Sequence, residues 1–437
     1  MDAVRFDVRE VIDLVGFLLR WSALGALVGV LAGLAGAVFL VSLEWATQTR
    51  ESTPWLLLLL PLGGLVVGLL YHHWAGPAAQ GNNLIIDEIH EPKAWLPRRM
   101  APLIYLGTII THLLGGSAGR EGTAIQMSGG LTDWFSRVTH MGPRDRRLML
   151  VTAIAGGFGA VFGVPLAGCV FALEVQSVGR LRHDALVPAL AAAITGDRVV
   201  RALGIHHTPT PVLDAVELTP AVVGKVVVAG VAFGLCAVLF VELTHGLKRL
   251  FARAVPYPPL RPFLGGVALV GLTFALGTRD YLGLSIPLIT DSLAGAANVV
   301  LFAFALKLLF TALTLGSGFQ GGEVTPLFVI GATLGATMGR LLGLPLPLAA
   351  AIGFVAVFAA AANTPLACTI MGLELFGVGP LVPLAIACTV AYICSSHRSI
   401  YTAQRIDTLK HGHQLDGSAT IASLIERRRD TSRSDAR

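Results

Sequence analysis

Charged residues are scarce in this chain of 437 residues: Asp, Glu, Lys and Arg together make up 14% of it. In a soluble domain, charged residues make up roughly a quarter of the sequence. The lower fraction in this chain indicates that most of it is not a soluble domain. Long apolar runs stand in their place, and the mean hydropathy is +0.71. These features predict a multi-pass membrane protein. The net charge of +5 is modest, and loops and tails explain it better than nucleic-acid binding does.

The usual signatures of metal, nucleotide and disulfide sites are also missing. The five cysteines lie in apolar stretches and form no C-x-x-C pair, so we expect them to be small buried side chains. No H-E-x-x-H occurs, and GSAGREG (116–122) lacks the Gly-Lys-Ser/Thr of a P-loop. No nucleophile–base pair stands among the apolar segments. We therefore expect no metal, no cofactor and no enzymatic activity.

The alternation of apolar and polar residues that marks a membrane β-barrel is absent from runs such as 24–41. The 50 glycines favour tightly packed helices instead. Several apolar segments are shorter than the roughly 20 residues of a full span, and others are interrupted, as in FGVPLAG (162–168) and AANTPLAC (361–368). Broken helices occur in membranes only where their freed backbone groups face protein or a wet cavity. The predicted fold is an all-α polytopic membrane protein with many tilted and broken helices, as in transporters and channels.

An internal repeat organises the chain. PLAGCVFALE (165–174) returns two hundred positions later as PLACTIMGLE (365–374), with five of ten residues identical. The same offset pairs the Gly-Ser at 116–117 with that at 316–317. We predict an interfacial amphipathic helix at 1–14, a first membrane repeat at 15–200, a polar connection at 201–218, a second membrane repeat at 219–401 and a basic cytoplasmic tail at 402–437 that is solvated and partly disordered. The sequence leaves open whether the two halves are inverted.

Three glycine-rich breaks carry the polar residues: GNNLIIDE (81–88), GGSAGREGT (115–123) and GSGFQGGEVTP (316–326). Glycine lets backbone N–H groups turn toward a common point, and a helix N-terminus adds partial positive charge there. Three such ends meeting at one place would hold an anion weakly enough for it to leave again. The alternative is that these glycines only pack helices.

Glu121 is the sharpest candidate within these breaks. An ionised glutamate occupies an anion site as a tethered anion, and a protonated one is neutral and can swing away. This predicts a gate that also carries protons. The alternative is a helix-start glutamate paired with Arg120, which itself braces the loop. We interpret Glu174 and Glu374, which lie at equivalent helix ends, as structural residues. We interpret residues 206–209 (HHTP) as a solvent-exposed loop.

Together with the late SIYTAQR (399–405), these motifs resemble the CLC family of chloride channels and proton-coupled anion antiporters over about 15–405. The resemblance implies a homodimer with one pore per subunit, each built from inverted helical halves. It also implies that Glu121 is the gating glutamate and that Tyr401 helps to coordinate the central anion.

Several positions depart from the chloride-handling pattern of that family. Asn82 and Asn83 replace its Ser-Gly, Thr123 replaces the proline after Gly-Arg-Glu-Gly, and Val175 stands where antiporters often carry an inner acid. In the second half, the Gly-x-Phe-x-Pro motif has Val in place of Phe. These departures are similar to the fluoride-exporting branch of the family.

We interpret the chain as a fluoride/proton antiporter that exports fluoride across the cell membrane, spans the lipid several times and keeps both termini in the cytoplasm. Amide donors suit fluoride, a strong hydrogen-bond acceptor, and a phenyl edge adds positive potential. The expected anion-binding residues are Asn82, Asn83, Gly119, Gly122, Phe319, Val324, Thr325 and Tyr401. Which Asn faces the ion stays open. The alternative function is a chloride channel or chloride/proton antiporter with variant motifs; a non-conducting scaffold fits less well because polar residues concentrate at the breaks.

Overall fold

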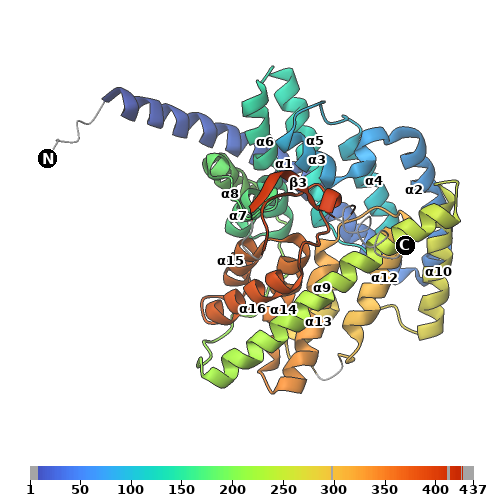
Figure 1. The fold of residues 1–437 in the computed structure, drawn as a ribbon. Helices are drawn as coiled ribbons and strands as arrows, with labels where there is room; N and C mark the ends of the chain where they lie inside the picture. Colours follow the sequence, from blue (N-terminus) through green and yellow to red (C-terminus); the bar gives the residue numbers. More distant parts are fainter. Residues whose placement is uncertain (1–7, 297–298, 411–413, 425, 427–437) are drawn as a thin grey trace.

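The computed structural model describes residues 8–296, 299–410, 414–424 and 426, which form a bundle of helices with one small sheet (Figure 1). The helices of the first half are α1 (Val8–Ser52), η1 (Pro54–Leu59), α2 (Leu60–Trp74), η2 (Gly76–Gln80), α3 (Asn82–His90), α4 (Met100–Leu113), α5 (Glu121–Val138), α6 (Pro143–Phe162), α7 (Pro165–Glu174), η3 (His183–Ala185) and α8 (Leu186–Ala202). Those of the second half are α9 (Pro220–Ala254), α10 (Leu260–Leu276), α11 (Ile286–Leu293), α12 (Ala303–Ser317), α13 (Val324–Leu342), α14 (Leu346–Ala362), α15 (Pro365–Phe376) and α16 (Leu381–Cys394).

The helices of the first half recur in order in the second. The α5 helix begins at Glu121 and α13 at Val324, whereas α7 begins at Pro165 and α15 at Pro365. This is the repeat that the sequence predicts. Pro at the first helical position fits α7 and α15 because its missing N–H has no partner there anyway.

The two halves are inverted with respect to each other. Backbone N–H groups of Leu366 and Ala367, at the start of α15, donate to the Glu174 carboxylate at the end of α7, over 3.1 and 2.8 Å. The reverse contact also exists, because the N–H groups of Leu166 and Ala167 donate to Glu374 over 3.0 and 2.7 Å. Each C-terminus therefore meets the other helix's N-terminus, so α7 and α15 run antiparallel. Both glutamates act as helix caps.

Glycines let the helices of the second half approach very closely. A Cβ atom built on Gly331 of α13 would lie 2.1 Å from the carbonyl oxygen of Gly353 on α14, and one on Gly353 would lie 2.2 Å from the oxygen of Gly331. Neither position has room for any side chain. Small residues at such crossings are what helix association in lipid requires.

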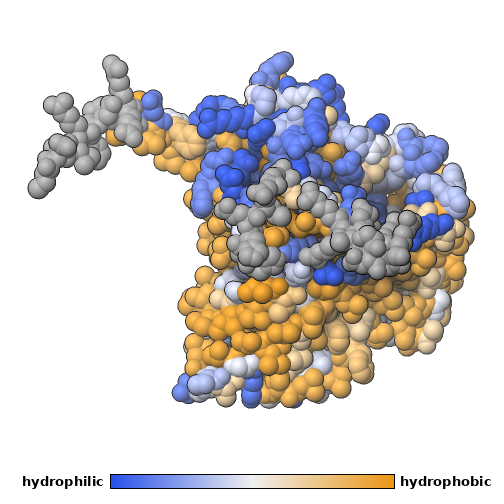
Figure 2. All heavy atoms as spheres, in the orientation of Figure 1, coloured by the Kyte–Doolittle hydropathy of each residue, from blue (hydrophilic) through white to orange (hydrophobic). Residues whose placement is uncertain are grey.

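A broad hydrophobic surface covers the lower part of one face of the molecule. Figure 2 shows it below a hydrophilic cap on the face drawn. Within the described residues, four helical segments are long and apolar enough to cross a membrane: Val11–Ser52, Pro54–Trp74, Pro220–Ala254 and Val324–Leu342. Others, such as α7 and α15, are apolar but short, as the interrupted segments predict. The chain is an integral membrane protein.

The two ends of the chain differ from the sequence-based picture in detail. The α1 helix continues through the predicted boundary at residue 14, and its first part projects away from the bundle (Figure 1). The tail is not simply a solvated extension, because β1 (Ser177–Val178), β2 (Arg405–Thr408) and β3 (Gln414–Thr420) form a sheet in that order. Ile406 and Ile421 are fully buried against it. The prediction of disorder for the last residues, 427–437, falls outside the described part of the chain.

Candidate functional site

Two equivalent helices begin at one point inside the bundle. The loops before α5 and α13 pair through Gly119 and Gly322, whose N–H groups donate to each other's carbonyl oxygens over 2.7 and 2.8 Å. A Cβ atom on Gly119 would lie 2.8 Å from Pro326, so glycine is required for this approach. The partially positive N-terminal ends of both helices therefore lie next to each other.

The Glu121 carboxylate is held between these two ends and is completely buried. The Thr325 hydroxyl donates to it, lying 2.7 Å from Oε1 and 2.6 Å from Oε2. The Thr325 N–H donates to Oε2 over 3.1 Å, and the Arg120 N–H does so over 3.3 Å. The Arg120 Nε lies 3.5 Å from Oε1, so the pair with Arg120 is present as well. Every one of these contacts comes from a donor or a cation, as an anion requires.

A small cavity next to this point brings Asn82 and Tyr401 together. Its lining comes from α3, α5, α6, α7 and the segment after α16, namely Asn82, Ile85, Ile86, Ile125, Ile154, Phe171, Val175 and Tyr401. About 10 Å³ is open to the centre of a water-sized sphere, which is roughly the room for one water molecule. A Cβ atom on Gly122 would lie 3.0 Å from Asn82 Nδ2, so the Asn82 amide packs directly on the first turn of α5.

The two asparagines have different surroundings. Asn82 faces the cavity, and its Oδ1 is buried with no hydrogen-bond partner among the described residues. Asn83 points elsewhere, because its Oδ1 accepts the N–H of Ala403 over 3.0 Å. Asn83 thus ties α3 to the segment that carries Tyr401.

Phe319 is not brought to this cavity. Its ring belongs to a separate apolar cluster with Leu57, Leu60 and Leu114, and its Cζ atom lies where a side chain on Gly64 would stand. Val324 begins α13 and is buried in the main core. The contribution of the Phe319 ring to an anion at the cavity therefore has no support in this structure.

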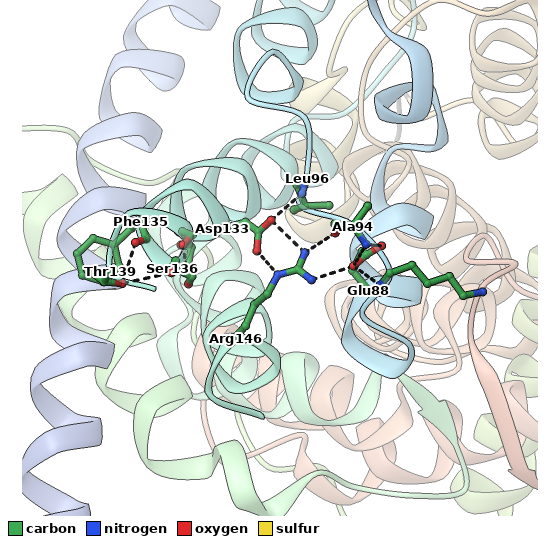
Figure 3. Close-up of polar contacts among 10 residues, drawn as sticks. Glu88, Ala94, Leu96, Asp133, Phe135, Ser136, Thr139 and Arg146 are labelled. Carbon is green, nitrogen blue, oxygen red and sulfur yellow. Dashed lines mark hydrogen bonds and ion pairs between the residues drawn. The ribbon is translucent and has the colours of Figure 1, made fainter. Parts of the chain in front are cut away.

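A buried ionic cluster fixes α3 against α5 and α6 (Figure 3). Arg146 of α6 binds Glu88 of α3 over 2.9 Å and Asp133 of α5 over 2.6 Å. Its Nη2 also donates to the Ala94 carbonyl oxygen, and the Trp95 ring lies 4.6 Å from its guanidinium carbon. These are three of the helices that line the cavity, so the cluster sets the position of Asn82 relative to α5.

Lys307 is another buried ionisable side chain, which sequence reasoning missed. Its Nζ donates to the Ser117 hydroxyl over 2.9 Å, the Gly283 carbonyl oxygen over 2.7 Å, the Ser285 hydroxyl over 2.9 Å and the Tyr281 carbonyl oxygen over 3.2 Å. The lysine thereby anchors the loop that leads to Glu121. A lone charge in an apolar helix is the signal that points to it.

A second cavity borders two of the residues that contact Glu121. Arg120 and Thr325 both line it, and residues 207–210 of the α8–α9 connection line it as well. His206, Thr208 and Pro209 are exposed, as a solvent loop requires. The His207 side chain differs from that interpretation, because it is only 12% exposed. The fold brings this segment back onto the bundle because Thr210 and Leu213 bond to carbonyl oxygens at the end of α15.

Comparison with known proteins identifies a matching family and proteins of similar sequence. The family model described as voltage gated chloride channel matches residues 63–396. The chain is 48% identical over 428 residues to a protein of Pseudomonas syringae pv. tomato named chloride/fluoride channel protein, with 96% of this chain and 94% of the relative covered. It is 30% identical to a voltage-gated ClC-type chloride channel of Escherichia coli, with 89% and 98% covered.

Solved structures agree with this picture. The crystal structure of a CLC-type fluoride/proton antiporter superposes with a TM-score of 0.86 at 36% identity, and 89% of this chain and 98% of that one are covered. A slow cyanobacterial chloride/proton antiporter superposes with a TM-score of 0.74 at 20% identity, with 86% and 94% covered. The second likeness concerns the fold alone.

Proposed function

This chain belongs to the voltage-gated chloride channel family, and from that premise we propose that it exchanges fluoride for protons, with Glu121 as gate and proton carrier. Fluoride leaves the cell as protons enter. We further propose that it acts in the cell membrane as a homodimer with one pore in each subunit, and that both of its termini face the cytoplasm.

The observation that carries this proposal is the setting of Glu121. Its carboxylate is buried between two helix N-termini and receives donors from both halves of the chain. An ionised Glu121 fills the place of a bound anion. Protonation removes the charge that the donors stabilise, and the neutral side chain then leaves the place free for an incoming ion.

The cavity at Asn82 favours a small anion. Its room is that of about one water molecule, and fluoride is of similar size. An amide N–H can replace part of the water that fluoride loses on entry. The names of two relatives support the same ion, since one is a chloride/fluoride channel protein and one is a fluoride/proton antiporter.

The second candidate is chloride transport, which the name of another relative favours. Purified protein in liposomes, loaded with equal fluoride and chloride, separates the two. Ion-selective electrodes follow each anion while a pH electrode follows protons. We expect fluoride efflux to exceed chloride efflux by at least about tenfold and to be accompanied by proton uptake. Chloride efflux that matches fluoride efflux would rule out the proposed selectivity, and efflux without proton movement would rule out exchange.

A further inference from the structure

The cavity beside Arg120 and Thr325 is large enough to hold a short chain of water. About 50 Å³ is open to the centre of a water-sized sphere, which corresponds to roughly three or four molecules. Part of the wall is apolar, with the rings of Phe162, Phe328 and Phe354. The titratable side chain contributed by the covering segment is that of His207.

The His207 ring is held in place from two sides. Its Cδ2 atom would lie 2.3 Å from a Cβ atom on Gly163, so the ring packs on the bare backbone at the end of α6. Its Nε2 is buried and lies 3.5 Å from Asp197 Oδ1, while the side chain as a whole is 12% exposed. Imidazole nitrogens can donate and accept protons, so this ring places a proton-transfer group at the edge of the cavity and opposite a carboxylate.

The cavity and the C-terminal sheet lie at opposite ends of α7. Gly163, against which His207 packs, comes just before Pro165 at the start of that helix, whereas β1 follows its last residue and pairs with β2. If the termini are cytoplasmic as proposed, the His207 cavity is on the outer side. Protons that enter the cell in exchange for fluoride would therefore reach Glu121 from this side.

We propose that His207 is the proton donor that serves Glu121 from the outer cavity. This inference rests on the proposed exchange of fluoride for protons. Protonated His207 releases the proton of its ring N–H to a water molecule in the cavity, and the water passes a proton to a Glu121 carboxylate oxygen beside Thr325. The N–H bond breaks, a new O–H bond forms on Glu121, and the neutral imidazole takes its next proton from external water.

Several charged groups surround His207. Asp197 faces the His207 ring, and Arg201 of the same helix binds that carboxylate over 2.8 Å. Arg120 lines the same cavity and opposes a second positive charge there. Glu374 at the end of α15 lies close enough to Asp197 to interact with it and adds negative charge. Removing the Asp197 charge should accordingly make His207 harder to protonate.

The test measures coupled fluoride efflux at a series of equal internal and external pH values from about 5.5 to 8. The variants are His207→Gln, Asp197→Asn and, as matched control, His206→Gln at the exposed neighbour. We expect His207→Gln to slow exchange by about tenfold or more, in line with the loss of a positioned acid, and to remove a pH-dependent step. Asp197→Asn should shift the midpoint of that step to lower pH. His206→Gln should behave as wild type.

A double variant separates proton delivery from simple structural damage. In Glu121→Gln the carrier is gone, so adding His207→Gln should leave the remaining fluoride flux unchanged. An unaltered pH profile in His207→Gln would overturn the proposal, as would an equal loss of flux with and without Glu121. Wild-type protein that moves fluoride without protons would instead refute the exchange function itself, whatever the His207 variants do.

Discussion

The Thr325 hydroxyl, from the second half of the chain, donates to both carboxylate oxygens of Glu121 in the first half. The Glu121 carboxylate thus competes with any arriving anion, because every donor that Thr325 offers to Glu121 is withheld from the ion. The strength of the hydrogen bonds between Thr325 and Glu121 therefore determines how readily an anion displaces the Glu121 carboxylate.

Replacing Thr325 with Val should weaken that hold. Hydrogen bonds to a charged group contribute about 1.5–3 kcal/mol, so the ionised Glu121 would be displaced more easily and the apparent fluoride affinity should rise roughly tenfold or more. Fluoride-dependent flux measured over a concentration series reads this out. The control is Thr333→Val, because the buried Thr333 hydroxyl bonds to carbonyl oxygens of its own helix. An affinity that responds equally to both changes would contradict the assignment.

Replacing Glu121 with Gln should abolish proton movement and leave fluoride flux that no longer depends on a proton gradient. The amide has nearly the shape of the acid but cannot take up and release a proton near neutral pH. A pH electrode and a fluoride electrode, used together on liposomes, provide the measurement. Continued proton uptake in step with fluoride would show that another group carries the proton.

Replacing Asn82 with Ser should lower the ratio of fluoride to chloride flux, since the shorter hydroxyl cannot reach the cavity as the amide does. Asn83→Ser is the matched comparison, because Asn83 instead accepts the Ala403 N–H. Its loss should leave selectivity near wild type and lower stability by about 0.5–1.5 kcal/mol. Flux ratios and thermal unfolding in detergent distinguish the two outcomes, and an equal shift in selectivity would contradict the placement of these side chains.

Glu374→Gln and Glu174→Gln should each destabilise the protein. A neutral amide is a weaker cap than a carboxylate, and helix caps contribute about 0.5–2 kcal/mol. Thermal unfolding in detergent should show a clear fall in Tm for both variants. Glu242→Gln serves as control, because Glu242 only pairs with Arg398 at the surface and such pairs contribute little. Similar falls in all three would mean that the caps contribute no more than a surface pair.

Lys307→Met should lower the unfolding free energy by about 1–3 kcal/mol, because the carbonyl oxygens of Tyr281 and Gly283 lose a buried donor. Flux should fall as well, since the loop leading to Glu121 loses its anchor at Ser117. Lys225→Met offers a matched control at a more exposed lysine that bonds to the Gly343 carbonyl oxygen. Unchanged stability in Lys307→Met would show that the hydroxyls and carbonyls pair without the amine.

Much of this architecture follows from sequence alone. The two-hundred-residue offset predicts the paired helices, and glycine-rich breaks predict where their ends meet. The break at 115–123 points to Glu121, and the resemblance to the family adds Thr325. The sequence could not predict which of the first residues of α3 faces the cavity. Adjacent residues of a helix point about 100° apart, and the direction of the first turn depends on Gly81, which has φ = 60°. Only the fold shows that Asn82 faces the cavity.

Other features were hidden for different physical reasons. Lys307 sits in an apolar run whose average masks a single charge. Phe319 follows a left-handed Gly318, which turns the chain in a direction that residue type does not reveal. The strand at 405–408 pairs with a two-residue strand far away in sequence, and such a short, distant pairing leaves no local pattern. The same holds for His207, whose loop is polar in composition yet anchored at the end of α15.

The exchange of caps between α7 and α15 has a consequence for ancestry. One half on its own has a helix start without its carboxylate and a buried glutamate without its donors. Two identical copies facing opposite ways would supply each other with both. A single-gene ancestor of this fold would therefore have needed to insert into the membrane in both orientations and pair with itself, and the gene duplication that followed turned contacts between two molecules into contacts within one chain.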